Sequence, residues 1–134
     1  MKFTAKEIMR YEEQNVLQFL DGIVTTKKYK ADKISKFLMQ LVTKYGEVAK
    51  QKEDYITKLI EKYGTEEEIA QKALKEDSPH KESAISEYNT FMEVWEKTEI
   101  EVDTDITLDF FDSGICWTAN AVRNQLMINE VFGR

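Results

Sequence analysis

The chain has few of the residues on which disulfide-bonded and zinc-binding proteins depend. Its 134 residues include one cysteine, one histidine, one proline and five glycines. A single cysteine, Cys116, excludes an intramolecular disulfide, and one cysteine with one histidine cannot supply the usual ligands of a zinc site. A lone cysteine suits a reducing compartment, so we expect the protein in the cytoplasm.

Motifs for nucleotide binding and for nucleophilic catalysis are also missing. The glycines are widely spaced, so neither a G-x-G-x-x-G loop nor a Walker A loop occurs. His80 follows Ser-Pro at a predicted helix start, where an exposed side chain fits better than an oriented general base. Cys116 lies between Ile115 and Trp117, without the basic neighbours that activate a thiolate. We predict a protein that is not an enzyme and uses no cofactor and no metal.

Long hydrophobic runs are absent as well. No stretch approaches the roughly 18 uncharged apolar residues of a membrane-spanning helix. The opening residues MKFTAKE lack the apolar run of a signal peptide. At roughly 100–200 residues per domain, the length predicts a single domain over residues 1–134.

The net charge of −6 conceals a difference between the two halves of the chain. Residues 1–63 carry 13 basic and 9 acidic side chains, whereas residues 64–134 carry 6 basic and 16 acidic ones. Such a difference is typical of intramolecular complementarity, of head-to-tail association into a homo-oligomer, or of a charged partner. Two solvated faces of opposite sign would also account for it.

The strongest helical pattern covers residues 31–63. Its apolar residues recur at intervals of four and three, which predicts one buried face, at Ile34, Leu38, Leu41, Tyr45, Val48, Tyr55 and Leu59. Gly46 interrupts the pattern and would cost about 1 kcal/mol inside a helix. The helix therefore either kinks near Gly46 or continues for about 50 Å. We favour the continuous, elongated form, packed as an antiparallel hairpin.

Shorter elements are predicted on both sides of this helix. Capping boxes at Thr4–Glu7 and Thr65–Glu68 begin helices over 5–21 and 66–75. Further helices are expected from Ser78-Pro79 to about 97 and over 115–131, and residues 23–26 form a short strand. The predicted fold is mainly α with a small β element (α+β), comprising a long helical hairpin and a short strand pair near residues 99–110, with which strand 23–26 could also pair.

The segment 99–110 alternates between apolar and polar residues, as in a half-buried strand. Acidic residues dominate its polar positions and extend just beyond it, and we call these six the acidic stripe: Glu99, Glu101, Asp103, Asp105, Asp109 and Asp112. Three hypotheses account for them. They could bind Ca²⁺ or Mg²⁺, although the EF-hand spacing and its glycine are missing. They could mimic a phosphate backbone. They could simply be solvated or paired with the chain's own lysines, which we favour.

A cluster of lysines precedes the long helix, and we call it the basic patch: Lys27, Lys28, Lys30, Lys33 and Lys36. A lysine cluster of this kind can contact phosphates or the acidic surface of a partner protein. Proteins that bind nucleic acid usually have basic domains, whereas the pI here is about 4.9. We therefore do not expect direct binding to nucleic acid, and we treat the basic patch and the acidic stripe as candidate partner-binding residues.

Four short motifs resemble a family of small uncharacterised phage and prophage proteins of Gram-positive bacteria. They are the opening Met1-Lys2-Phe3-Thr4 with Glu7-Ile8, then Lys62-Tyr63-Gly64, the segment from Glu99 to Leu108, and Leu126-Met127-Ile128. The resemblance implies a phage accessory role in the cytoplasm of a host cell, and it transfers no catalytic residue. Residues 129–132 extend beyond the usual acidic end of the family.

These observations lead to two functional hypotheses. In the first, the chain is a non-catalytic phage-type accessory protein that acts by protein–protein interaction in an assembly or structural role, with a phage protein, a host protein or a second copy as partner. In the second, it is an acidic inhibitor of a host nucleic-acid enzyme, an anti-defence protein that mimics the phosphate backbone.

Overall fold

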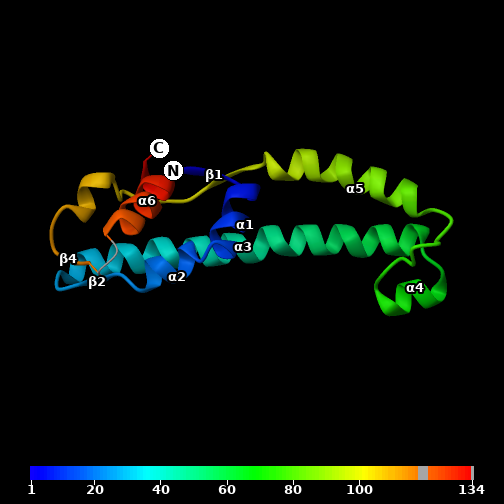
Figure 1. Cartoon of the computed structure of the whole chain (residues 1–134), viewed down its shortest axis with the longest axis horizontal. Helices are drawn as coiled ribbons and strands as arrows, with labels where there is room; N and C mark the ends of the chain where they lie inside the picture. The colour runs from blue at the N-terminus through cyan, green and yellow to red at the C-terminus, as the bar shows by residue number, and fades with distance from the viewer. Residues whose placement is uncertain (118–120, 134) are drawn as a thin grey trace.

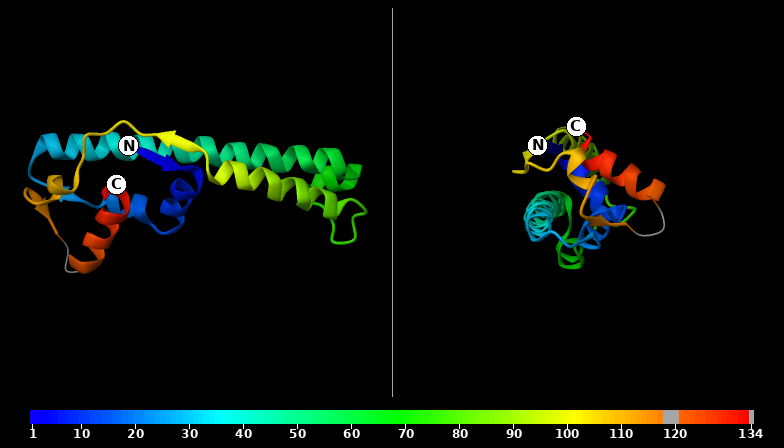
Figure 2. Two further views of the ribbon diagram at one scale, coloured as in Figure 1. Left: turned by 90° about the horizontal axis from the view of Figure 1, so that it is seen from above. Right: turned by 90° about the vertical axis from the view of Figure 1, so that its left-hand side faces the viewer.

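A long helix organises the molecule. A computed structural model gives the fold and describes residues 1–117 and 121–133. Helix α3, Lys28–Tyr63, runs along the whole length, and α5, Lys81–Glu96, lies antiparallel beside its second half (Figure 1). Helix α4, Glu66–Gln71, lies at the far end of α3, and the remaining small elements gather around the first half of α3 (Figure 1 and Figure 2). We call residues 47–97 the arm and the remainder the base. The predicted mainly α fold with a small β component is confirmed.

Helix α3 is continuous through Gly46, so the elongated form is the correct one. Its 36 residues correspond to about 54 Å. Gly46 is exposed, and an added Cβ would meet no atom within 4 Å. The helix begins at Lys28 rather than residue 31, so part of the basic patch belongs to its first turns.

The two helices of the arm are joined by tyrosines and one carboxylate. The ring of Tyr55 stacks on Phe91 with 4.0 Å between centroids. The carboxylate of Glu87 accepts hydrogen bonds from Lys62 Nζ at 2.7 Å and from the Tyr63 hydroxyl at 2.6 Å. These two donors lower the pKa of Glu87. Both tyrosines come from α3, so these contacts fix the middle of α5 against it.

The predicted helix over 5–21 is wrong as a single helix. The structure has α1, Ala5–Glu13, and α2, Val16–Asp21, separated at Asn15. Asn15 has φ of 60°, a left-handed conformation that asparagine tolerates better than most residues. The capping box at the start of α1 is confirmed, since the Glu7 amide donates to Thr4 Oγ1 and the Thr4 amide donates to Glu7 Oε1.

Two small antiparallel sheets join distant parts of the base, and neither has the predicted pairing. Strand β1, Lys2–Thr4, pairs with β3, Glu99–Glu101, with Phe3 opposite Ile100. Strand β2, Val24–Thr25, pairs with β4, Ile115–Cys116. The strand pair expected near residues 99–110 takes only β3 from that segment, because after β3 the chain runs extended along α3 and then enters a 3-10 helix, η1, Leu108–Phe111.

Three further helix boundaries differ from the prediction. Helix α4 is Glu66–Gln71 and ends at Lys72, whose φ is 57°. Helix α5 starts at Lys81, with His80 as its N-cap, rather than at Pro79. Helix α6 is Ala121–Phe132, because the chain at 115–116 pairs as β4; residues 118–120 of the expected helix 115–131 lie outside the described residues.

The hydrophobic core lies in the base. Side chains from α1, α2, α6 and the extended segment pack against the first half of α3, and the most buried include Phe3, Ile8, Tyr11, Phe37, Leu41, Val102 and Ile128. The Phe37 and Phe132 rings lie 4.9 Å apart, so the end of the described chain closes against α3. Burial raises the pKa of Tyr11 to about 12.

Candidate functional site

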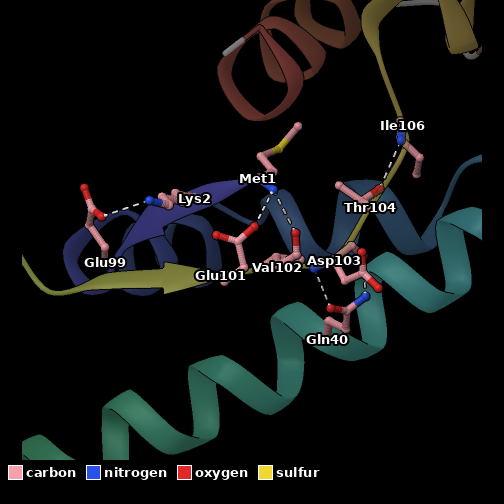
Figure 3. Close-up of polar contacts among 9 residues, drawn as sticks. All are labelled: Met1, Lys2, Gln40, Glu99, Glu101, Val102, Asp103, Thr104 and Ile106. Atoms are coloured by element: carbon pink, nitrogen blue, oxygen red, sulfur yellow. Dashed lines mark hydrogen bonds and ion pairs between the residues drawn. The ribbon is translucent and has the colours of Figure 1, made fainter.

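The acidic stripe lies on the surface of the base. Its first residues follow β3 and the extended chain beside α3, as Figure 3 shows for Glu99, Glu101 and Asp103, whereas Asp109 belongs to η1 and Asp112 follows it. All six of its residues are exposed. Of the apolar residues between them, Val102 and Ile106 turn inward and are almost completely buried, whereas Leu108, at the start of η1, is exposed. The alternation read from the sequence therefore holds as far as Ile106, although within this segment only β3 belongs to a sheet.

Cations from elsewhere in the chain compensate half of the stripe. Glu99 lies 3.7 Å from Lys2 Nζ, Glu101 lies 3.1 Å from the amino group of Met1, and Asp105 lies 2.7 Å from Lys33 Nζ. The hydrogen bond from Lys33 lowers the pKa of Asp105. One pair thus joins the stripe to the basic patch, as the self-pairing hypothesis requires. Among the described residues, the carboxylates of Asp103 and Asp112 have no ion pair.

Gln40 fixes the stripe against α3. Its side-chain nitrogen donates to the Asp103 carbonyl at 2.6 Å, and the Asp103 amide donates to Gln40 Oε1 at 2.8 Å (Figure 3). The side-chain amide of Gln40 thus makes the two backbone hydrogen bonds that a neighbouring strand would otherwise make. These two hydrogen bonds hold the backbone of Asp103 in place, and its carboxylate lies at the surface.

Lys30 does not fit its predicted role as a partner-binding residue. It is 5% exposed, and its ammonium group donates to the carbonyl oxygens of Phe110 and Ser113 while it lies 4.7 Å from the centre of the Phe110 ring. A charge in this position fastens the segment after η1 to the first turn of α3. It is therefore a structural lysine and not part of an exposed patch.

The other four lysines of the basic patch lie at the surface in two groups. Lys27 and Lys28 stand at the start of α3 and are exposed. Lys33 and Lys36 line a cleft of about 390 Å³ together with Phe37 and Gln40 of α3 and with residues 103–105 of the extended chain. The structure thus brings the end of the basic patch to the middle of the acidic stripe, and the charges there largely compensate one another.

The single cysteine and histidine occupy separate places. Cys116 is exposed and lines a small pocket of about 170 Å³ with Phe19 and Trp117. His80 is exposed at the start of α5, with its ring 6.1 Å from that of Tyr63. Within the described part of the chain, no group of three His, Cys, Asp or Glu side chains could hold a metal ion. No helix among the described residues has the length and apolarity needed to cross a membrane.

An apolar groove on the arm is the feature that sequence reasoning missed. It measures about 360 Å³ and lies between α3, α5 and the segment after α4; its lining is Ile56, Leu59, Ile60, Lys72, Ala73, Leu74, Lys81, Ala84, Ile85 and Tyr88. Ile56 and Ile85 remain 36% and 47% exposed. The sequence does indicate it, because Ile56 and Ile60 lie beside the row of apolar residues spaced four and three apart and widen the apolar face of α3. A single antiparallel helix cannot cover a face of that width, so part of it stays exposed.

Glu68 holds the wall of this groove. It is 2% exposed, and its carboxylate accepts hydrogen bonds from the backbone amides of Thr65 and Lys75 and from the Ser78 hydroxyl. These hydrogen bonds, that from the Lys75 amide above all, lower the pKa of Glu68. The capping box predicted here is confirmed, and it also positions the segment 72–75 beside α3.

The arm groove and the acidic stripe are thus the two candidate interaction surfaces. The groove is apolar with lysines at its edge, whereas the stripe is polar and partly compensated. No protein-family model, curated protein or solved structure matches this chain, so its function has to be inferred from these surfaces.

Proposed function

We propose that this chain is a non-catalytic, phage-type accessory protein that acts by protein–protein interaction in an assembly or structural role. The observation that carries the proposal is the arm, in which two helices project from the base (Figure 1). Its groove leaves apolar side chains exposed. The phage origin is supported by the resemblance of the four short motifs described above.

A projecting pair of helices suits contact with another protein. Two antiparallel helices bury one stripe of each against the other and leave the flanking apolar positions uncovered. In this arm, the short α4 and the segment behind it cover only one side. Apolar surface bordered by polar residues is typical of a surface that meets a partner.

Photo-crosslinking in cells that carry the gene tests this proposal. A benzoyl-phenylalanine at Glu82 or Asn89, both exposed on α5 and outside the groove lining, should give an adduct of one discrete mass. The matched control is the same group at Glu13, which is exposed on the base. An adduct of twice the chain mass would identify a second copy as the partner. Absence of any adduct from both arm positions, or an adduct at Glu13 alone, would contradict the proposal.

The alternative is an acidic inhibitor of a host nucleic-acid enzyme. The exposure of all six carboxylates of the stripe favours it. Pairing with Lys2, Lys33 and the amino group of Met1 removes about half of the free charge, which makes the stripe a weaker phosphate mimic than its sequence indicates.

Competition with nucleic acid distinguishes this alternative. If the stripe occupies a nucleic-acid groove, double-stranded DNA added before irradiation should prevent adduct formation, and the joint change of Asp103, Asp109 and Asp112 to Asn should abolish capture. The changes Glu12→Gln and Glu13→Gln on exposed positions of α1 are the control. Capture that survives both the DNA and the stripe variant rules the inhibitor out.

A further inference from the structure

The arm groove has the form of an incomplete helix bundle. Its floor is formed by Leu59 and Ile60 of α3, and one wall is the turn of α5 that carries Ala84 and Ile85. The opposite wall is short, because α4 has only six residues and the chain behind it supplies just Ala73 and Leu74. Side chains four residues apart form ridges on both long helices, and the grooves between these ridges can accept the ridges of a third helix.

Two lysines at the edge of the groove have no counter-charge of their own. Among the described residues, the ammonium groups of Lys72 and Lys81 make no ion pair and no hydrogen bond. Their neighbours Lys62 and Lys75 are paired with Glu87 and Glu67. The unpaired cations therefore lie beside the open apolar surface of the groove, and they favour a partner that carries carboxylates.

Lys72 is also held in an unusual backbone conformation. Its φ of 57° is left-handed, a conformation that glycine adopts at helix ends at little cost and lysine does not. The conformation places a long cationic side chain between the groove and an adjoining depression along α3, which Lys72 also lines.

The length of the groove limits what fits. Its α5 wall extends from Lys81 to Tyr88, which is about 10 Å, or two helical turns. Two turns present two apolar side chains three or four residues apart, with polar positions on either side. The groove is open along one side, as a bound helix requires, and does not enclose a small molecule.

We propose that the arm groove binds a short amphipathic helix of a partner protein, with two apolar anchors three or four residues apart and flanking Asp or Glu residues that face Lys72 and Lys81. This inference rests on the proposed function and specifies its surface and the chemistry of its partner.

Peptide display on the full chain tests the chemistry without knowledge of the partner. Selection from a random library of peptides of about 14 residues should enrich apolar pairs at the helical spacing together with Asp and Glu. A fluorescent peptide of the enriched sequence then serves as the probe, and its affinity is measured by fluorescence polarisation. Enrichment of sequences without an acidic bias would overturn the proposal.

Charge reversal identifies the surface. The double variant Lys72→Glu and Lys81→Glu should weaken peptide binding by about tenfold or more, and added salt should no longer weaken binding, because like charges then face one another. The matched control is Lys50→Glu with Lys58→Glu, two exposed lysines of α3 outside the groove, which should change affinity less than about twofold. A peptide with Lys in place of its acidic residues should restore binding to the double variant.

A second variant separates binding from folding. Lys72→Gly relieves the left-handed backbone, so it should keep or raise the melting temperature while it weakens peptide binding. Unchanged affinity in both Lys72→Gly and the double variant would overturn the proposal, as would self-association through the groove in sedimentation or displacement of the peptide by dodecanoate. If the photo-crosslinked adduct persists in the double variant, the interaction function holds and this assignment of its surface fails.

Discussion

At the scale of single residues, Lys30 is the most consequential side chain of the basic patch. A buried ammonium group is costly unless it is hydrogen-bonded, and here two backbone carbonyls and an aromatic face surround it. Gly114 lies in the same contact, since its φ is +72° and an added Cβ would stand 2.9 Å from Lys27 Cγ. The start of α3 and the segment 108–114 thus pack closely against each other.

Lys30→Met should destabilise the protein by about 1–3 kcal/mol, because it leaves the carbonyls of Phe110 and Ser113 without a donor. Urea unfolding followed by circular dichroism measures the loss. Lys28→Met, an exposed position two residues away, is the control and should stay within about 0.5 kcal/mol of the parent. Equal effects of the two changes would show that Lys30 is not structural.

The sequence distinguishes these lysines poorly. The five members of the basic patch look alike in composition and charge, and only the tertiary contact with residues 110–113 separates Lys30 from the rest. Pairing between the acidic stripe and the chain's own lysines could be proposed from the sequence, because opposite charges attract, but the specific pair of Lys33 and Asp105 could not. Its partners are 72 positions apart, so their proximity depends on the path of the whole chain.

At the scale of elements, α3 keeps its helical geometry through Gly46 because packing on both sides of that position outweighs the weak propensity of one glycine. Leu41 and Val48 are buried on either side of it. Gly46 itself faces solvent, so the residue serves no close approach of another segment.

Gly46→Ala should therefore stabilise the protein by about 0.5–1 kcal/mol, through a smaller loss of backbone entropy on folding. Gly114→Ala, at a left-handed position with a 2.9 Å approach to Lys27, should do the reverse. Thermal unfolding of both variants gives the comparison. A lower melting temperature for Gly46→Ala would mean that the helix is not continuous there in solution.

The arm should respond to acid through Glu87. Its pKa is lowered by Lys62 and Tyr63, so the ionised form stabilises the folded state at neutral pH. This contribution is present above the unfolded pKa of about 4.3 and is lost as the pH falls through the lower folded value.

Glu87→Gln should lower stability at about pH 7, and the difference from the parent should shrink below about pH 4. Glu82→Gln, an exposed residue of the same helix, is the control. Urea unfolding at the two pH values measures the difference. A constant gap between parent and Glu87→Gln at both values would exclude the predicted linkage.

Local signals predicted the elements better than their partners. Both capping boxes are confirmed, because their hydrogen bonds join residues only three positions apart. The strand partners were wrong, because the pairing of β1 with β3 depends on how α3 and α5 return the chain. The break at Asn15 interrupts a segment whose apolar spacing continues across it, so periodicity alone could not locate it.

At the scale of the whole molecule, the two halves of opposite charge lie on each other. The ion pairs of Lys2 with Glu99, Arg10 with Glu130, Lys33 with Asp105 and Lys62 with Glu87 each join a residue of 1–63 to one of 64–134. Part of the charge difference is thus used inside one chain. Each such pair at the surface contributes little stability, but together they favour this arrangement over others.

The arm makes the protein longer than a compact chain of the same size. We expect a radius of gyration clearly above the roughly 14 Å of a compact domain of this length, and a maximum dimension of at least about 54 Å, set by α3. Small-angle X-ray scattering measures both. A radius of gyration near 14 Å would show that the arm folds back onto the base in solution.

The pairing of β1 with β3 has a consequence for the time course of folding. Met1 and Glu101 are 100 positions apart, whereas Lys62 and Glu87 are separated by 25. Short loops close at lower entropic cost, so we expect the arm hairpin to form first and to return residue 99 to the base. Pulsed hydrogen exchange should then protect amides of the arm before those of β1. During synthesis on the ribosome, the first strand made therefore waits, unpaired, until most of the chain has emerged.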